Sequence, residues 1–284
     1  MDVIPLHDPE TGTITYVVAD PATNACAVID SVLDYDPKAA RTSAAGAERI
    51  VSLLRERGLT CQWLLETHVH ADHLSAASWL KPRIGGQIGI GRQVTPVRRL
   101  FSDLFDLGAA FPTDGRQFDH LFEDNETFAI GTLRARAIHT PGHTPACMAY
   151  LIEEAIFVGD TLFMPDSGTA RRDFSGGDAR TLYRSIHRIL DLPPETRIFT
   201  CHDHAPGGRA PAWESTVAEQ RTHNIHVHDG ITEDQFVAPR TARDATLGMP
   251  NLILPSVQVN IRAGQMPEPD AHGRRFLKLP LNAI

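Results

Sequence analysis

Cysteine is scarce in this 284-residue chain, and the chain has neither long apolar runs nor blocks of like charge. The four cysteines, Cys26, Cys61, Cys147 and Cys201, are far apart and form no CxxC pair, which disfavours a disulfide framework or a structural zinc knuckle. We expect reduced, mostly buried thiols. No run of about 18 apolar residues marks a membrane span, and the N-terminus lacks the basic start and apolar core of a secretory signal. A cytoplasmic protein that does not enter the membrane is expected.

The balance of charge excludes another class of partner. Twenty-seven basic and 35 acidic residues give a formal net charge of −8, which argues against a general affinity for the phosphate backbone of nucleic acids. The 42 % hydrophobic content is ample for a buried core. No low-complexity linker divides the chain, so we expect one domain over residues 1–284, with an extended C-terminal tail from about residue 250. Whether the protein forms a homodimer stays open.

Four predicted strands each end at a side chain that can bind a metal. The segment "CQWLLET" runs into "HVHADH", "RARAIHT" ends at "PGH", "EEAIFVGD" ends in aspartate, and "TRIFTCH" ends in histidine. Helices are predicted over residues 44–57, from about residue 75, over 178–190 and over 212–224. Strands mixed with helices, without an internal repeat, favour an α/β sandwich.

The strand ends carry a set of candidate metal ligands. Seven residues make up this set: His68, His70, Asp72, His73, His143, Asp160 and His202. In an extended turn, His68 and His70 project to the same side, so the first cluster can converge on one ion. Imidazoles and carboxylates together suit zinc, iron or manganese rather than calcium. The sequence therefore predicts a transition-metal centre.

The motifs "THVHADH", "HTPGHT", "VGDTLF" and "CHDH" resemble the five-part signature of the metallo-β-lactamase fold. That resemblance implies a four-layer αβ/βα sandwich with its metal site along one edge of two facing sheets. The signature specifies the fold but not the reaction, because hydrolases, oxidoreductases and nucleases share it.

The segment "TLFMPDSGTARRDFSGGDARTLYRSI" resembles the persulfide dioxygenases, above all the bacterial members, and the resemblance continues through "VAEQRTHNIHVHDG" and "ILPSVQVNIRAG". It implies one Fe(II) per chain, held by His68, His143 and Asp160, and oxidation of glutathione persulfide by O2 and water to sulfite and glutathione. Two imidazoles and one carboxylate on one face of iron leave three positions for substrate and dioxygen. Five further residues would then surround the iron without binding it: His70, Asp72, His73, His202 and His204.

The same resemblance implies a substrate-binding arginine, Arg171 in "GTARRDF". A guanidinium can hold a glutathione carboxylate through paired hydrogen bonds. Asp173 is expected to orient Arg171 or to cap a turn. Two residues depart from the family pattern. Arg172 stands where relatives often have Cys or Thr, and His204 in "CHDH" replaces the tyrosine of "HDY", so the roles of these two side chains stay open.

Two other functions also stay open. A thioester hydrolase resembling glyoxalase II would use two metals, all seven ligands and an activated bridging hydroxide. The long "DSGTARRDFSGGDA" match, together with the lack of an extended C-terminal helical domain, ranks this hydrolase behind the dioxygenase. A non-enzymatic sensor of sulfur species ranks last, because it requires that the ligand cluster hold no metal.

Overall fold

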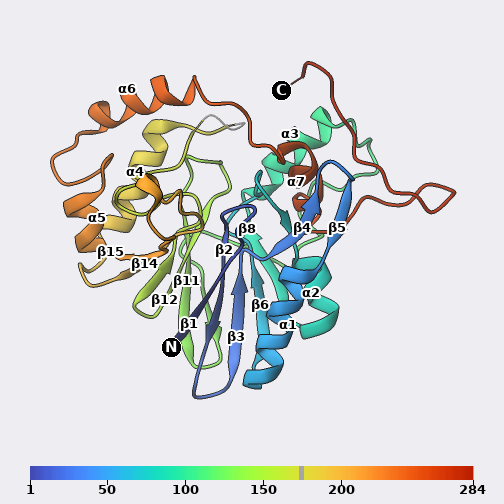
Figure 1. Ribbon diagram of the computed structural model, residues 1–284, viewed down its shortest axis with the longest axis horizontal. Coiled ribbons are helices and arrows are strands. Elements are labelled where there is room, and N and C mark those ends of the chain that lie inside the picture. The colour runs from blue at the N-terminus through green and yellow to red at the C-terminus, as the bar shows by residue number, and fades with distance from the viewer. Residues whose placement is uncertain (173–175, 284) are drawn as a thin grey trace.

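Two six-stranded sheets face each other in the computed structural model, which describes residues 1–172 and 176–283 (Figure 1). The first sheet consists, in spatial order, of β1 (Asp2–His7), β2 (Ile14–Ala19), β3 (Ala25–Ile29), β6 (Thr60–Leu65), β8 (Gln87–Gly91) and β9 (His120–Phe122). The second consists of β10 (Thr127–Ile130), β11 (Leu133–His139), β12 (Met148–Ile152), β13 (Ala155–Phe157), β14 (Arg197–Phe199) and β15 (Glu214–Thr216). A small sheet joins β5 (Arg41–Ser43), β4 (Val32–Asp36) and β7 (Leu74–Ser75).

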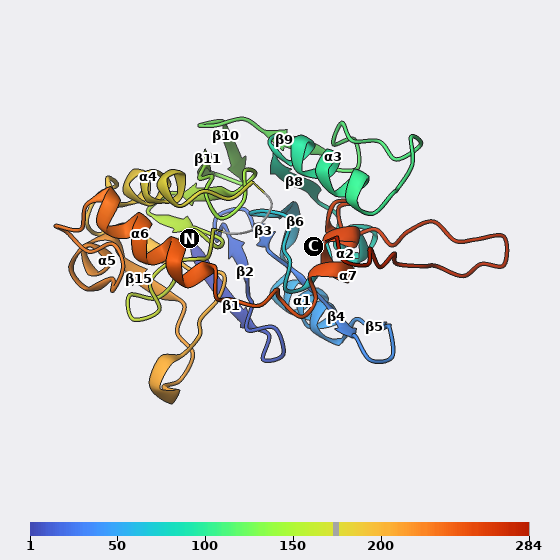
Figure 2. The same ribbon diagram turned by 90° about the horizontal axis from the view of Figure 1, so that it is seen from above.

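Helices cover the outer side of each large sheet. The first sheet is covered by α1 (Ala45–Arg57), α2 (Ala77–Ile84), α3 (Val94–Leu104) and α7 (Ile253–Asn260). The second is covered by α4 (Ala179–Leu190), α5 (Val217–His223) and α6 (Glu233–Asp244), which lie together on one side of the molecule in Figure 2. One short 3-10 helix, η1 (Pro206–Gly208), lies between β14 and β15.

Separate apolar clusters fill the spaces between these layers. Along β2, Tyr16 and Val18 point between the two sheets, whereas Val17 points to the helices, because successive side chains of a strand face opposite sides. Leu182 and Ile186 of α4 form part of a third cluster, on the outer side of the second sheet. The predicted four-layer αβ/βα sandwich is confirmed.

Three predicted helices are confirmed. The helix predicted from about residue 75 is α2, which starts at Ala77. The ends of the other two have local causes. Helix α1 ends at Gly58, whose φ of 63° is a left-handed conformation that glycine adopts without a Cβ clash. Helix α4 begins after Asp178, whose side chain accepts a hydrogen bond from the Thr181 amide. The helix predicted over 212–224 is wrong in its first part. Strand β15 occupies residues 214–216, and α5 starts only after Thr216, which forms a capping box with Glu219.

The extended tail predicted from about residue 250 is also wrong in its first part, because α7 occupies residues 253–260. Its β-branched residues and Pro255 favour an extended prediction, yet Pro255 lies in the first turn, where proline is tolerated. Val257 and Val259 are buried in the cluster beside the first sheet, and this packing stabilises the helix. Beyond residue 264 the described segment forms neither helix nor strand and reaches outward (Figure 2).

No helix within the described ranges has the length and apolar character that crossing a membrane requires.

Candidate metal centre

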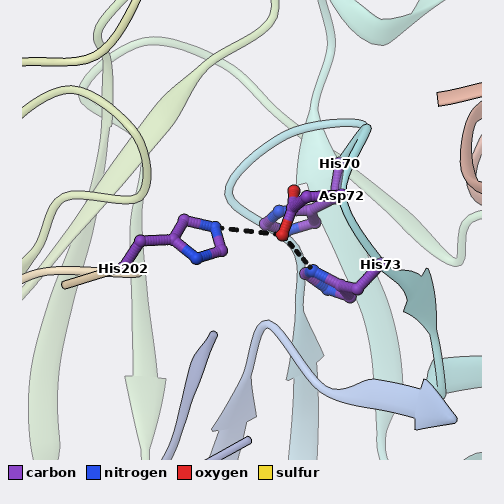
Figure 3. A group of neighbouring side chains, drawn as sticks. All are labelled: His70, Asp72, His73 and His202. Carbon is purple, nitrogen blue, oxygen red and sulfur yellow. Dashed lines mark hydrogen bonds and ion pairs between the residues drawn. The ribbon is translucent and has the colours of Figure 1, made fainter. Parts of the chain in front are cut away.

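The seven candidate ligands converge at one edge of the two sheets. They form two groups, and within each group the ligand atoms lie within 4.8 Å of one another. The first group is His68, His143 and Asp160, and the second is His70, Asp72, His73 and His202. Figure 3 shows the second group, in which Asp72 Oδ2 lies 3.2 Å from His202 Nε2 and 3.2 Å from His73 Nδ1.

Asp160 faces both groups. Its Oδ2 lies 3.9 Å from His68 Nε2 and 3.7 Å from His143 Nε2, whereas its Oδ1 lies 3.5 Å from His202 Nε2. The predicted convergence of His68 and His70 is confirmed, with ring centroids 4.0 Å apart. The His70 ring lies 4.2 Å from the His73 ring, so His70 links the two groups.

Hydrogen bonds fix how the imidazoles point. His70 Nε2 donates to Asp30 Oδ1 at 2.9 Å, and His143 Nδ1 donates to the Arg171 carbonyl at 2.7 Å, since both acceptors lack a proton. A metal-binding histidine commonly donates its second ring N–H to a carboxylate or a carbonyl in this way. The arrangement leaves His70 Nδ1 and His143 Nε2 directed at the cluster.

The hydrogen-bond partners of the buried candidate ligand atoms show whether these residues fit a metal ion. Five ligand atoms have no hydrogen-bond partner among the described residues: His68 Nε2, His70 Nδ1, His73 Nε2, His202 Nε2 and Asp160 Oδ1. A buried polar atom without a partner costs about 1–3 kcal/mol, and coordination of a cation relieves that cost. Imidazole nitrogens with carboxylate oxygens are ligands for zinc, iron or manganese. The residues present therefore fit a transition-metal centre.

Protonation in this region follows from burial and neighbouring charge. Burial, together with the imidazoles of His70 and His143, holds the pKa of His68 well below its usual range. Burial also opposes protonation of His70, but the carboxylates of Asp30, Glu66 and Asp72 together outweigh it and raise the pKa of His70 to about 10. Burial raises the pKa of Glu66, whose Oε2 lies 3.6 Å from His70 Nε2, to about 8. Since a ligating imidazole must be neutral at the binding nitrogen, metal binding here is coupled to proton release.

Two residues that hold the ligand loop, Asp30 and Asn260, are not among the predicted site residues. Asp30 accepts hydrogen bonds from the Thr67 amide at 2.7 Å and the Thr67 hydroxyl at 2.8 Å, in addition to the bond from His70. Its sequence signal was available, because "AVID" ends a strand in aspartate just as "FVGD" does. Asn260 of α7 donates to the carbonyls of His70 and His73 at 2.9 and 2.8 Å. No local pattern marks Asn260.

A cavity of about 380 Å³ opens onto the ligands. Its walls include Phe163, the loop from Thr169 to Arg171, His204, two arginines of α6, and Leu247. Arg171, the predicted substrate-binding arginine, lines this cavity, and its Nη1 donates to the Gly248 carbonyl at 2.8 Å. Binding of substrate by Arg171 stays a prediction.

The two residues that depart from the family pattern differ in position. His204 lines the cavity together with candidate ligands, with its ring edge-on to Phe163 at 5.1 Å. Arg172 does not line it, and its amide donates to Asp244 Oδ2 at 2.9 Å. Asp173, predicted to orient Arg171, lies outside the described residues. All four cysteines are free and buried, as predicted.

Comparison with known proteins gives the relationships of the chain. A family model described as "Metallo-beta-lactamase superfamily" matches residues 8–202. The chain is 58 % identical to a probable metallo-hydrolase of Burkholderia pseudomallei, with 100 % of both chains covered. It is 47 % identical to glyoxylase B2 of Dictyostelium discoideum, over 100 % of this chain and 97 % of that protein. A beta-lactamase hydrolase-like protein of Xylella fastidiosa is 53 % identical over 98 % of this chain, which spans only 64 % of that protein.

Persulfide dioxygenases are related at a greater distance. The human persulfide dioxygenase ETHE1 is 28 % identical over 91 % of this chain and 87 % of that protein. The crystal structure of ETHE1 from Myxococcus xanthus is similar with a TM-score of 0.75 and 28 % identity, covering 93 % of this chain and 100 % of that one. The resemblance seen in the sequence is therefore real but distant, whereas the more similar relatives carry hydrolase or glyoxylase names.

Proposed function

Because the chain belongs to the metallo-beta-lactamase superfamily, we propose that it is an enzyme that hydrolyses a thioester at a two-metal centre. The observation that carries the proposal is Asp160, whose two oxygens face different ligand groups, His143 at 3.7 Å and His202 at 3.5 Å. A carboxylate in this position can be shared by two ions. The names of the relatives from Burkholderia pseudomallei and Dictyostelium discoideum support a hydrolase of this kind.

The proposal assigns every ligand. One ion would be held by His68, His143 and Asp160, and the other by His70, Asp72, His73 and His202, with Asp160 facing both groups. Two bound divalent ions supply Lewis-acid polarisation of a carbonyl and a water-derived nucleophile at neutral pH. The chain's own contribution is orientation. Asp30 and the Arg171 carbonyl hold the rings of His70 and His143, as supporting residues do in metal sites.

Two side chains of the cavity walls support binding of a thioester substrate. Phe163 lies edge-on to His202 with ring centroids 6.4 Å apart, so an apolar surface limits water beside the ligands. Arg171 provides a cation on the same wall for an anionic part of the substrate.

The second candidate function is persulfide dioxygenation at a single Fe(II). One observation favours it specifically: His68, His143 and Asp160 form by themselves a set of two imidazoles and one carboxylate. That set is typical of oxygenases with a facial ligand triad. The distant relationship to human persulfide dioxygenase supports it, but it leaves the second ligand group without an ion.

Metal analysis and two activity assays on one preparation distinguish the candidates. Two ions per chain, with hydrolysis of S-lactoylglutathione and no uptake of O2, is the expected result. One iron per chain, with O2 uptake and sulfite formation from glutathione persulfide, would overturn the hydrolase and support the dioxygenase. A metal-loaded preparation inactive in both assays would contradict both.

A further inference from the structure

Helix α6 contributes two arginines to the cavity, and their surroundings differ. Arg240 and Arg243 line both the metal-site cavity and a neighbouring cavity of about 330 Å³. Arg240 is 5 % exposed, its Nη1 donates to the Thr169 carbonyl at 3.1 Å, and its Nη2 forms an ion pair with Asp244. Its charge is compensated, and its role is to hold the loop that precedes Arg171.

Arg243 lies one turn further along the same helix and is exposed at the cavity rim. Its guanidinium makes no hydrogen bond or ion pair with any residue in the described ranges. The nearby acid Asp244 is occupied, because its Oδ1 pairs with Arg240 and its Oδ2 accepts from the Arg172 amide. Arg243 therefore brings an uncompensated positive charge to this wall.

The other acidic and basic groups on this side do not cancel that charge. Asp166 and Asp203, beside the cavity, are both bound by Arg209, at 2.6 Å in the case of Asp166. His226 accepts a hydrogen bond at Nδ1 from the Thr169 amide at 3.1 Å. Burial, with Arg240 and Arg243, lowers the pKa of His226 to about 4, so this imidazole is neutral at pH 7.

The chain has a net charge of −8 and as a whole repels anions. A local positive charge such as that of Arg243 can nevertheless attract an anionic group to the cavity. An arginine without a partner matches the paired oxygens of a carboxylate or phosphate. The α6 wall is distinct from the ligand loops, so a group bound there belongs to the part of the substrate that does not react.

We propose that Arg243 binds an anionic group, a carboxylate or a phosphate, on the thiol half of the substrate and so selects anionic thiols over neutral ones. The inference rests on the proposed thioester hydrolysis for the identity of the reacting half. Binding of the released thiol, which needs no reaction, tests it separately.

The test is calorimetric titration of metal-loaded protein with three thiols. Glutathione carries carboxylates, coenzyme A carries phosphates, and N-acetylcysteamine is neutral. We expect one anionic thiol to bind, and Arg243→Ala to weaken its binding about tenfold or more while N-acetylcysteamine is unaffected. Arg243→Lys should restore part of the affinity, because it keeps the charge but not the planar fork. Whichever anionic thiol responds identifies the group as carboxylate or phosphate.

Arg49→Ala is the matched control, since Arg49 is also an exposed arginine of a helix, α1. It should bind the thiols as the wild type does. Equal affinity of the wild type and Arg243→Ala for both anionic thiols, or no binding of either, overturns the inference. Binding as expected without thioester hydrolysis overturns only the proposed function, whereas hydrolysis with unchanged binding overturns only the role of Arg243. In an active preparation, Arg243→Ala should raise KM and leave kcat unchanged.

Discussion

The two aspartates on either side of β3 show how differently the two ends of the sandwich use the same side chain. Asp20 precedes β3 and accepts hydrogen bonds from the Thr132 amide at 2.6 Å, the Thr132 hydroxyl at 2.8 Å and the Thr23 hydroxyl at 2.7 Å. Asp30 follows β3 and accepts from Thr67 and from His70. Both side chains are buried, at 1 % and 2 % exposure, so burial does not distinguish them.

The two aspartates differ in whether the groups that donate hydrogen bonds to them have all their own polar atoms satisfied. The donors to Asp20 are backbone amides and hydroxyls, and they join the β2–β3 turn to the β10–β11 turn, so this end is complete without a ligand. The His70 ring that donates to Asp30 has a buried second nitrogen without a hydrogen-bond partner among the described residues. At the Asp20 end of the sandwich, the polar groups are therefore satisfied by hydrogen bonds within the protein. At the Asp30 end, the ring nitrogen that remains without a partner can bind a cation.

Removing the Asp160 carboxylate should have the largest effect, on both metal binding and activity. In Asp160→Ala the ligand groups lose the one carboxylate that faces both, so we expect metal content to fall in both groups and activity to fall to background. Elemental analysis and the thioester assay measure the two effects. Normal metal content with normal turnover would mean that Asp72 provides the needed carboxylate instead.

Asp30→Asn should have the next largest effect. The amide keeps the size of the side chain but removes the charge that holds the His70 ring, so metal affinity should fall about 10- to 100-fold. Competition with a chelator measures the affinity, and activity should recover when excess metal is added. Asp20→Asn is the matched control, with unchanged metal affinity. Equal losses in the two variants would show that the two ends do not differ in function.

The same contrast explains how much could be predicted from the sequence. The four-layer fold, α1, α2, α4 and the convergence of the seven candidate ligands carry local signals, namely apolar periodicity and metal-binding residues at strand ends. Asn260 could not be predicted, because its contacts with the ligand loop join residues 187 and 190 positions apart in the chain. Helix α7 was missed for the same reason, since packing rather than propensity stabilises it.

The reaction is less predictable than the ligands. The same seven side chains can hold one iron or two ions, and the sequence pattern does not separate these outcomes. Arg243 lies on α6, a helix that sequence periodicity did not predict, so its place at the cavity became visible only from the fold.

The smallest expected effect is that of Asp20, at the end of the sandwich away from the candidate ligands, on the stability of the fold. Hydrogen bonds from the Thr132 amide and the Thr23 hydroxyl lower the pKa of Asp20 below its usual range. A carboxyl whose pKa is lower in the folded than in the unfolded chain stabilises the fold above the unfolded value, about 3.9, and this contribution declines as the pH falls below it. Metal-free Asp20→Asn should therefore melt at a lower temperature than metal-free wild type at pH 7.

The difference between the two should shrink as the pH falls from about 4 toward 2, because the Asp20 carboxyl of the unfolded wild type then binds a proton, whereas the folded carboxylate stays ionised to a lower pH. Thermal denaturation of both chelated proteins across this range measures the effect, and chelation ensures that metal release does not contribute. A difference in melting temperature that stays constant from pH 7 to pH 3 would show that the shape of the Asp20 hydrogen bonds, rather than the charge, stabilises this end. At pH 7 the metal-loaded variant should retain wild-type activity, since none of the seven ligands contacts Asp20.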